Sequence, residues 1–303
     1  MSAPAAAAAS EHYLAEAAGA GLLRRVRGLR YVAGVHHDLL LDERRFLVEY
    51  ADEELLADPV WLDGLVGRAL GEDPEAASVV VRAPASVRLD GPWRPELSYL
   101  YHPAGADVPA AGTDEGTDEG THGGTDGGTG LRVRPAGPAE ETAVADWLVR
   151  AMVHGTADLG ATADPEVAAE LARECLAAPG RHSYVAHLDG RAVGHATLLC
   201  EAADEVTGRR AVELVDVLVD LPDGPRSEPA AALTAAALAH ARRLELPLLG
   251  HVVHPSQRTD ADRGARIVAS LRARGWRADH VFWRRPTGPA AADSPSRSTK
   301  GAA

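Results

Sequence analysis

The feature that most constrains this chain is a run of three strands followed by a helix. Residues 183–199 form a predicted hairpin that turns at Asp189 and Gly190, a strong two-residue turn signal. A third predicted strand, residues 212–219, precedes an alanine-rich helix that begins near Pro229. Strands that lead into a helix N-terminus present backbone N–H groups to a phosphate. The order therefore favours a fold with an anion-binding site at the start of this helix.

Composition limits the class of protein. The 303 residues, 46% hydrophobic and 25% charged, allow one large domain or two small ones. The 31 Lys and Arg against 44 Asp and Glu leave a net charge of −13, which argues against binding to nucleic acid or an anionic membrane. The single lysine, Lys300, lies in a Pro, Ser and Ala-rich tail, which excludes Schiff-base chemistry and a lysine-tipped phosphate loop.

Cysteine usage and hydropathy indicate the compartment. Cys175 and Cys200 have neither CxxC nor metal-ligand spacing, so we expect reduced thiols in packing roles and no metal site. Residues 1–10 lack the basic and leucine-rich parts of a signal peptide, and no apolar run reaches the ~18 residues of a membrane span. We therefore expect a soluble, cytoplasmic protein.

A glycine-rich segment divides the chain. Residues 103–130 contain GTDEGTDEGTHGGTDGGTG, which is too polar to bury anything and predicts a flexible linker. A calcium-binding repeat is disfavoured because the period of four lacks an apolar stacking residue. The predicted organisation is an N-terminal α/β subdomain (1–102), the linker (103–130), a larger domain (131–286) and a disordered tail (287–303).

Hydrophobic periodicity and turn residues predict the elements of both halves. In the first half they are strands 29–41 and 45–50, helix 59–70, and strands 79–82 and 93–101. In the second half they are strand 131–134, helices 138–154 and 165–178, strands 183–188, 191–199 and 212–219, helix 229–244, strand 248–253, helix 263–274 and strand 278–284. The fold class is α/β of the α+β type, with a mixed, mostly antiparallel sheet flanked by helices.

A faint internal repeat relates the two halves. VVVRAP at 79–84 resembles GHVVHP at 250–255, and PWRPELSYLYHP at 92–103 resembles GWRADHVFWRRP at 275–286. The pattern indicates a duplication whose first copy lacks the helix between the two strands. Chance similarity between two strands of like character is the alternative.

The second half resembles the GNAT superfamily of acetyl-coenzyme A dependent N-acetyltransferases. The resemblance rests on the element order, on ELVDVLVDLP (213–222) leading into AAALTAAALAHARRLELP (230–247), and on ARIVASLRARGWRADHVF (265–282). It implies that the strand before the helix splays from its neighbour and that its backbone binds the pantetheine arm of acetyl-CoA. The matching positions are Val217, Leu218 and Val219.

The phosphate loop departs from the family pattern of Gln or Arg followed by x-x-Gly-x-Gly/Ala. This chain reads GPRSEPAAAL, so either Pro229 and Ala231 or Glu228 and Ala230 occupy the two small positions. Proline supplies no N–H, and Glu228 would repel a diphosphate. Arg226 and the helix dipole would still attract an anion, so we expect weakened binding, with Arg226, Ala230 and Ala231 as contacts.

Acyl transfer to an amine needs a base and a proton donor for the leaving thiolate. The resemblance implies a Glu on the third hairpin strand, where Glu213 and Asp216 lie three apart and are expected to point to opposite faces. His251 is a further base candidate, and His254 a weaker one. Leu271 occupies the position of the family's tyrosine, and Ser270 beside it is a poor substitute.

Three readings follow. The first is an enzyme that moves an acetyl group from acetyl-CoA to a small-molecule or peptide amine by direct attack, as a monomer or homodimer, with an acidic surface suited to a cationic acceptor. The second is a catalytically silent module that binds an acyl carrier or another protein. The third is the fold alone without carrier binding. The first half resembles the inactive partner of tandem acetyltransferases, is expected to cover the edge of the second sheet or shape the amine pocket, and shows no catalytic residues of its own.

Overall fold

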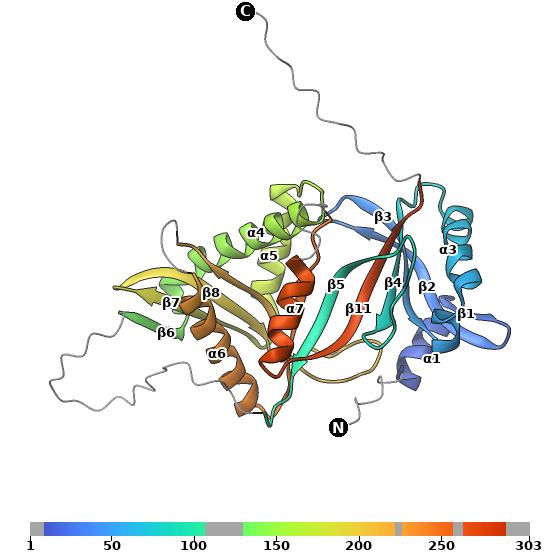
Figure 1. Cartoon of the computed structure of the whole chain (residues 1–303). Helices are drawn as coiled ribbons and strands as arrows, with labels where there is room; N and C mark the ends of the chain where they lie inside the picture. Colours follow the sequence, from blue (N-terminus) through green and yellow to red (C-terminus); the bar gives the residue numbers. More distant parts are fainter. Residues whose placement is uncertain (1–8, 107–129, 222–225, 257–262, 289–303) are drawn as a thin grey trace, which may run out of the picture.

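The computed structural model describes residues 9–106, 130–221, 226–256 and 263–288, which form one mixed sheet with helices on both faces (Figure 1). The strand order is β1-β2-β3-β4-β11-β5-β10-β9-β8-β7-β6. Neighbouring strands are antiparallel except for the β3–β4 and β10–β9 pairs. The predicted fold class, a mostly antiparallel sheet flanked by helices, is confirmed.

The N-terminal half contains each element that the sequence predicted and three more. Its elements are α1 (Glu11–Gly19), β1 (Leu23–Val26), β2 (Leu29–Asp38), β3 (Glu43–Ala51), α2 (Glu53–Leu56), α3 (Pro59–Glu72), β4 (Ser78–Pro84) and β5 (Arg94–His102). Helix α3 begins where expected, because Asp58 accepts hydrogen bonds from the amides of Val60 and Trp61 and Pro59 follows it. Elements α1, β1 and α2 were not anticipated.

The C-terminal half follows the predicted order. Its elements are β6 (Leu131–Pro135), a 3-10 turn η1 (Pro138–Glu140), α4 (Glu141–Asp158), α5 (Pro165–Ala177), β7 (Arg181–Leu188), β8 (Arg191–Leu199), β9 (Val212–Val219), α6 (Ser227–Arg243), β10 (Leu248–Val253), α7 (Arg263–Ala273) and β11 (Arg277–Pro286). Asp164 caps α5 through the amide of Glu166. Helix α6 begins at Ser227, two residues before the predicted start.

The two halves exchange their last strands. Strand β5 of the first half lies between β10 and β11 of the second. Strand β11 lies between β5 and β4 (Figure 1). Apart from β6, the strand order is therefore symmetric about the β5–β11 pair, as expected of two copies with exchanged ends. The first half covers an edge of the second sheet, as expected, and it does so by pairing its last strand with β10 inside the shared sheet.

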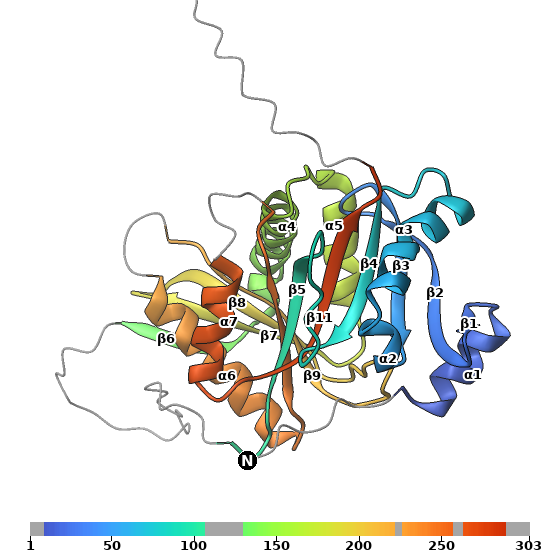
Figure 2. The same cartoon turned by 45° about the vertical axis from the view of Figure 1, so that its right-hand side comes forward.

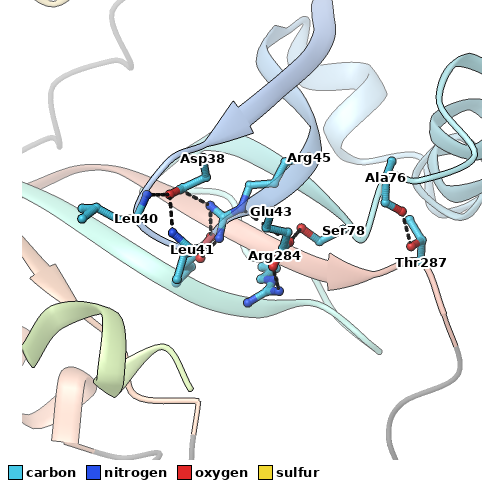
Figure 3. Close-up of polar contacts among 10 residues, drawn as sticks. Asp38, Leu40, Leu41, Glu43, Arg45, Ala76, Ser78, Arg284 and Thr287 are labelled. Carbon is cyan, nitrogen blue, oxygen red and sulfur yellow. Dashed lines mark hydrogen bonds and ion pairs between the residues drawn. The ribbon is translucent and has the colours of Figure 1, made fainter. Parts of the chain in front are cut away.

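An ionic network centred on the buried Arg45 links strands of the two halves, and Figure 3 shows its members Asp38, Glu43, Arg45 and Arg284. Arg45 of β3 is 8% exposed and its Nη2 donates to Glu96 of β5 at 2.7 Å. It also lies near Asp38 and Glu43 at 3.2 and 3.5 Å. Arg284 of β11 donates to the other oxygen of Glu43 at 2.5 Å. One cluster thus links β3, β5 and β11, which come from both halves.

Four hydrophobic clusters pack the helices against the sheet. Helix α3 covers β3 and β4, and α6 covers the middle of the C-terminal strands on the same face. On the other face α4 and α5 pack over β7 and β9, and α1 packs on β2 (Figures 1 and 2). Between them the loop of residues 200–211 reaches the N-terminal half, where the Val206 carbonyl accepts from Ser10 N at 2.8 Å.

The predicted domain boundaries at residues 102, 131 and 286 stay a prediction. The two halves share one sheet, so the sheet topology does not mark where one domain ends and the next begins. Residues 107–129 of the predicted linker and 289–303 of the predicted tail lie outside the described residues. Within the parts that the structure describes, no helix has the length and apolar character needed to cross a membrane.

Candidate functional site

Strands β9 and β10 diverge from each other in the middle of the sheet. They pair in parallel only at Val212, Glu213 and Leu214, which lie beside Leu248, Leu249 and Gly250. Strand β9 continues to Val219 and β10 to Val253, with no further pairs between them. Beyond Leu214 and Gly250 the β9 backbone edge that faces β10 is therefore unpaired along residues 215–219, where Val217, Leu218 and Val219 lie. The splay that the resemblance implied is confirmed.

A bulge in β9 corrects one expectation about its carboxylates. Leu198 of β8 pairs with Leu214 and Thr197 pairs with Asp216, so Val215 is an extra residue. Leu214 and Val217 consequently both pack toward α6. Glu213 and Asp216 therefore lie on the same face of the sheet, the face of α4 and α5, and not on opposite faces as the spacing alone predicted.

Asp216 lies next to a buried histidine. Its Oδ2 lies 3.4 Å from Nε2 of His195, a fully buried residue of β8. The His195 ring stacks on Trp147 of α4 at 5.7 Å between centroids, and its Nδ1 lies 3.0 Å from Thr197 Oγ1. Asp216 thus lies against a buried imidazole and does not line the cavity that Glu213 faces, which makes it a weaker base candidate than Glu213.

Glu213 faces a cavity of about 300 Å³ that lies between the central strands and the 200–211 loop. Its carboxyl forms no ion pair or hydrogen bond with any residue that the structure describes. Burial raises its pKa above the ordinary carboxyl range. A carboxylate of raised pKa without a counter-ion is suited to take a proton from a bound ammonium group.

His251 lies directly opposite Tyr99 of β5, with 5.5 Å between ring centroids. The side chain reaches solvent, yet many protein atoms surround it, because it follows Gly250, where β10 separates from β9. This desolvation lowers its pKa, and Asp216 partly offsets the effect. The neutral imidazole that results can accept a proton, so His251 remains a base candidate.

His254 is placed differently. It is 8% exposed and its Nε2 lies 2.8 Å from Ser98 Oγ. A Cβ at Gly264 of α7 would lie only 2.4 Å from its Nδ1, so the ring is wedged between β5 and α7. Burial lowers its pKa. These contacts give His254 a packing role on the face opposite Glu213.

The predicted carrier residues of α6 line a groove between α6 and α7. The groove has a volume of about 650 Å³ and includes Ala230 and Ala231, together with Leu271 and Trp276. Small side chains on α6 leave room for an extended arm. Leu271, at the position of the family's tyrosine, faces this groove and offers no proton.

The start of α6 is poor in phosphate donors, as the sequence indicated. Pro229 is the third helical residue and has no N–H, while the amide of Ala230 donates to the Arg226 carbonyl at 3.2 Å. Arg226 is the N-cap residue, and its Nε donates to the Leu221 carbonyl at 3.0 Å. Residues 222–225, which precede it, lie outside the described residues.

Two residues that line the candidate site were not identified from the sequence. Tyr99 belongs to the N-terminal half and reaches the cavity of Glu213 only because β5 enters the second sheet. Arg274 follows α7, lines the α6–α7 groove and forms no ion pair with a described residue. Only the topology identifies Tyr99, whereas Arg274 lies in the segment that resembles the family's closing helix.

Comparison with known proteins gives a likeness of fold only. No family model matches the chain, and no curated protein matches it either. Among solved structures, a GCN5-related N-acetyltransferase from Sphaerobacter thermophilus is 17% identical with a TM-score of 0.47, over 86% of this chain and 77% of that one.

Two further structures are similar at the same level. A GNAT-family acetyltransferase from Colwellia psychrerythraea is 12% identical with a TM-score of 0.46, over 87% of this chain and 84% of that chain. A tandem GNAT protein from the clavulanic acid biosynthesis pathway is 14% identical with a TM-score of 0.41, over 88% and 82%. Because these values are low, we derive the function of this chain from its own residues. Its element order and its β9–β10 splay match what the resemblance in the sequence implied.

Proposed function

We propose that the chain is an N-acyltransferase that uses acetyl-CoA to acylate a primary amine. The observation that carries the proposal is the splay of β9 from β10, with Glu213 on one face of the sheet and the α6–α7 groove on the other. The unpaired edge of β9 at Val217, Leu218 and Val219 would hold the amide-rich arm of the carrier. Arg226 and Arg274 supply positive charge for its phosphates.

When bound, acetyl-CoA supplies the activated acyl group. Glu213 removes a proton from the acceptor ammonium, so that the amine nitrogen gains a free electron pair. The amine nitrogen then forms the new amide bond while the carbon–sulfur bond breaks, and the thiolate takes up the second proton, which the acylated nitrogen releases. His251 is the alternative base, and the direct transfer needs no covalent enzyme intermediate.

The test is release of free thiol from acetyl-CoA in the presence of primary amines. The wild-type chain is expected to release thiol in an amine-dependent way, and Glu213→Gln is expected to lose this activity while still binding the carrier. Carrier binding without amine-dependent release by the wild type, over a broad panel of amines, would contradict the proposal.

A second candidate is a carrier-binding module without transfer activity. Leu271 in the place of a proton donor and Pro229 at the start of α6 favour it. The same experiment separates the two candidates, because a silent module binds acetyl-CoA and releases no thiol.

The symmetric strand order and the internal repeat support a tandem origin for the two halves. On this view the N-terminal half is a duplicated copy that lost its own transfer site. Its cleft between β3 and β4 is lined by Asp52, Glu53 and Glu54, which would repel a diphosphate.

A further inference from the structure

The cavity that Glu213 faces is built from both halves of the chain. Strand β9 contributes Glu213, strand β5 contributes Tyr99, and strand β11 contributes His280 and Phe282. The 200–211 loop closes it with small residues, among them Ala203. A site for the acceptor in this cavity would therefore be incomplete without the N-terminal half.

The Tyr99 ring is held rigidly. It stacks on His280 with 4.5 Å between centroids and a 14° angle between planes, and Phe282 contacts it edge-on at 5.8 Å. His251 flanks its other side at 5.5 Å. Because three rings fix it, Tyr99 loses little conformational entropy when a ligand binds.

The Tyr99 hydroxyl, in contrast, has no hydrogen-bond partner among the described residues, although Tyr99 lines the cavity. Burial and the nearby Glu213 raise its pKa to about 12. The phenol is therefore neutral at ordinary pH and can accept a hydrogen bond from an ammonium or donate one to an amine.

The charge of the cavity selects a cation. Glu49, Glu205 and Glu213 line it, and the lining guanidinium of Arg82 is paired with Asp204 at 2.6 Å. The faces of Tyr99 and Phe282 add aromatic surface that attracts an ammonium group. An anionic acceptor would meet Glu205 and Glu213, which have no ion-pair partner among the described residues, and Glu49, which accepts from the Tyr13 hydroxyl at 2.8 Å.

The loop that closes the cavity is fastened to the N-terminal half. Asp204 accepts from Arg82 of β4, and both side chains are about one-tenth exposed. Asp204 also accepts from the amide and hydroxyl of Thr207 at 2.7 and 2.8 Å. The roof of the cavity is thus fixed in place and not a mobile lid.

From these observations we propose that Tyr99 is an acceptor-binding residue of the transfer site, where it positions a primary ammonium group against Glu213. The substrate class is a compact primary amine, cationic at neutral pH. The inference rests on the proposed function, and it assigns to the N-terminal half a role in choosing the acceptor.

The test compares Tyr99→Phe with the wild type. The probes are three primary amines: a short diamine, an aralkyl monoamine and an amino-acid amide. Tyr99→Phe keeps the ring and its stacking, so the fold is expected to be unchanged. Loss of the hydrogen bond is expected to raise KM for the amine by about three- to tenfold, with little change in kcat and none in the Kd for acetyl-CoA. Tyr99→Leu removes the ring as well as the hydroxyl. It is expected to raise KM for the amine more than Tyr99→Phe does, which measures the contribution of the ring.

Tyr101→Phe is the matched control. Tyr101 lies two residues along the same strand, stacks on Arg209 at 5.0 Å and is not among the cavity residues. The KM of Tyr101→Phe for the amine is expected to equal that of the wild type. An unchanged KM in Tyr99→Phe, with transfer intact, would overturn this inference alone, and absence of acetyl-CoA binding or transfer in the wild type would overturn the proposed function with it.

Discussion

The ring of Tyr99 stacks on that of His280, 4.5 Å apart and inclined by 14°. Tyr99 lies on the last strand of the N-terminal half and His280 on the last strand of the C-terminal half, so this contact lies at the centre of the strand exchange. The exchange places a side chain from one half beside Glu213 of the other. The two halves therefore line one cavity in one shared sheet.

Glu213→Gln is expected to lower kcat/KM for the amine by about 10²- to 10⁴-fold, because it removes the proton acceptor. Burial raises the pKa of Glu213, so the active carboxylate forms only above the ordinary carboxyl range. In the wild type kcat/KM should rise with pH through that raised pKa, and the variant should lack this limb. Glu201→Gln, exposed on the loop after β8, is the control. Wild-type activity in Glu213→Gln would transfer the role to His251.

Gly194→Ala is expected to displace the β9 backbone at the proposed acetyl-CoA site, because Gly194 of β8 pairs with Val219 of β9. A Cβ at Gly194 would lie 2.4 Å from the Leu218 carbonyl oxygen and 3.0 Å from Val219 Cα, and neither backbone group can rotate away. The variant should lose about 1–3 kcal/mol of unfolding free energy and bind acetyl-CoA more weakly. Calorimetry and urea unfolding check both.

Gly155→Ala is the control for that substitution. Gly155 lies within α4, and apart from the backbone of its own helix no atom lies within 4 Å of a Cβ added there. It should leave acetyl-CoA affinity unchanged and gain about 0.5–1 kcal/mol of stability. Equal affinity in Gly194→Ala and the wild type would argue against carrier contacts at Leu218 and Val219.

Arg45→Met is expected to lower the unfolding free energy by about 3–5 kcal/mol, because it leaves Glu96 buried without its partner. Urea unfolding measures the loss. The control is Glu170→Ala, which breaks an exposed pair with Arg173 and should cost no more than about 0.5 kcal/mol. Similar losses in the two variants would mean that the buried network does not stabilise the exchanged strands.

Acid is expected to destabilise the fold through His240. Burial lowers its pKa from 6.5 to about 4, and His182 and Arg243 add to the effect. Between these two values the unfolded chain binds a proton that the folded chain does not, so the unfolding free energy should fall as the pH drops from 6.5 to 4.

His240→Gln should flatten that dependence in thermal unfolding curves recorded across this pH range. His12→Gln, at an exposed position of α1, should leave the slope as in the wild type. A slope in His240→Gln as steep as in the wild type would assign the acid sensitivity to other groups.

Most elements could be predicted because their signals are local. Strand Leu248–Val253 has the predicted bounds, and Asp58 and Asp164 mark the starts of two helices. The bulge at Val215 could not be predicted, because it depends on how β9 pairs with β8. It decides that Glu213 and Asp216 share a face, which the three-residue spacing had placed on opposite faces.

The strand exchange could not be predicted for the same reason as the bulge, because it also depends on how distant strands pair. The residues of β5 predict a strand from their alternation of large and small side chains, but they do not specify its neighbours. Tyr99 therefore carried no functional signal in the sequence, although the repeat had already aligned its position with Phe282. Pairing between distant segments determines the site.

Isothermal titration of the wild-type chain with acetyl-CoA tests the central claim most directly. We expect a saturable binding isotherm with one site per chain, retained in Glu213→Gln and weakened in Gly194→Ala. Absence of binding heat and of any complex at millimolar acetyl-CoA would contradict the account, because the splay of β9 from β10 would then serve no acyl carrier.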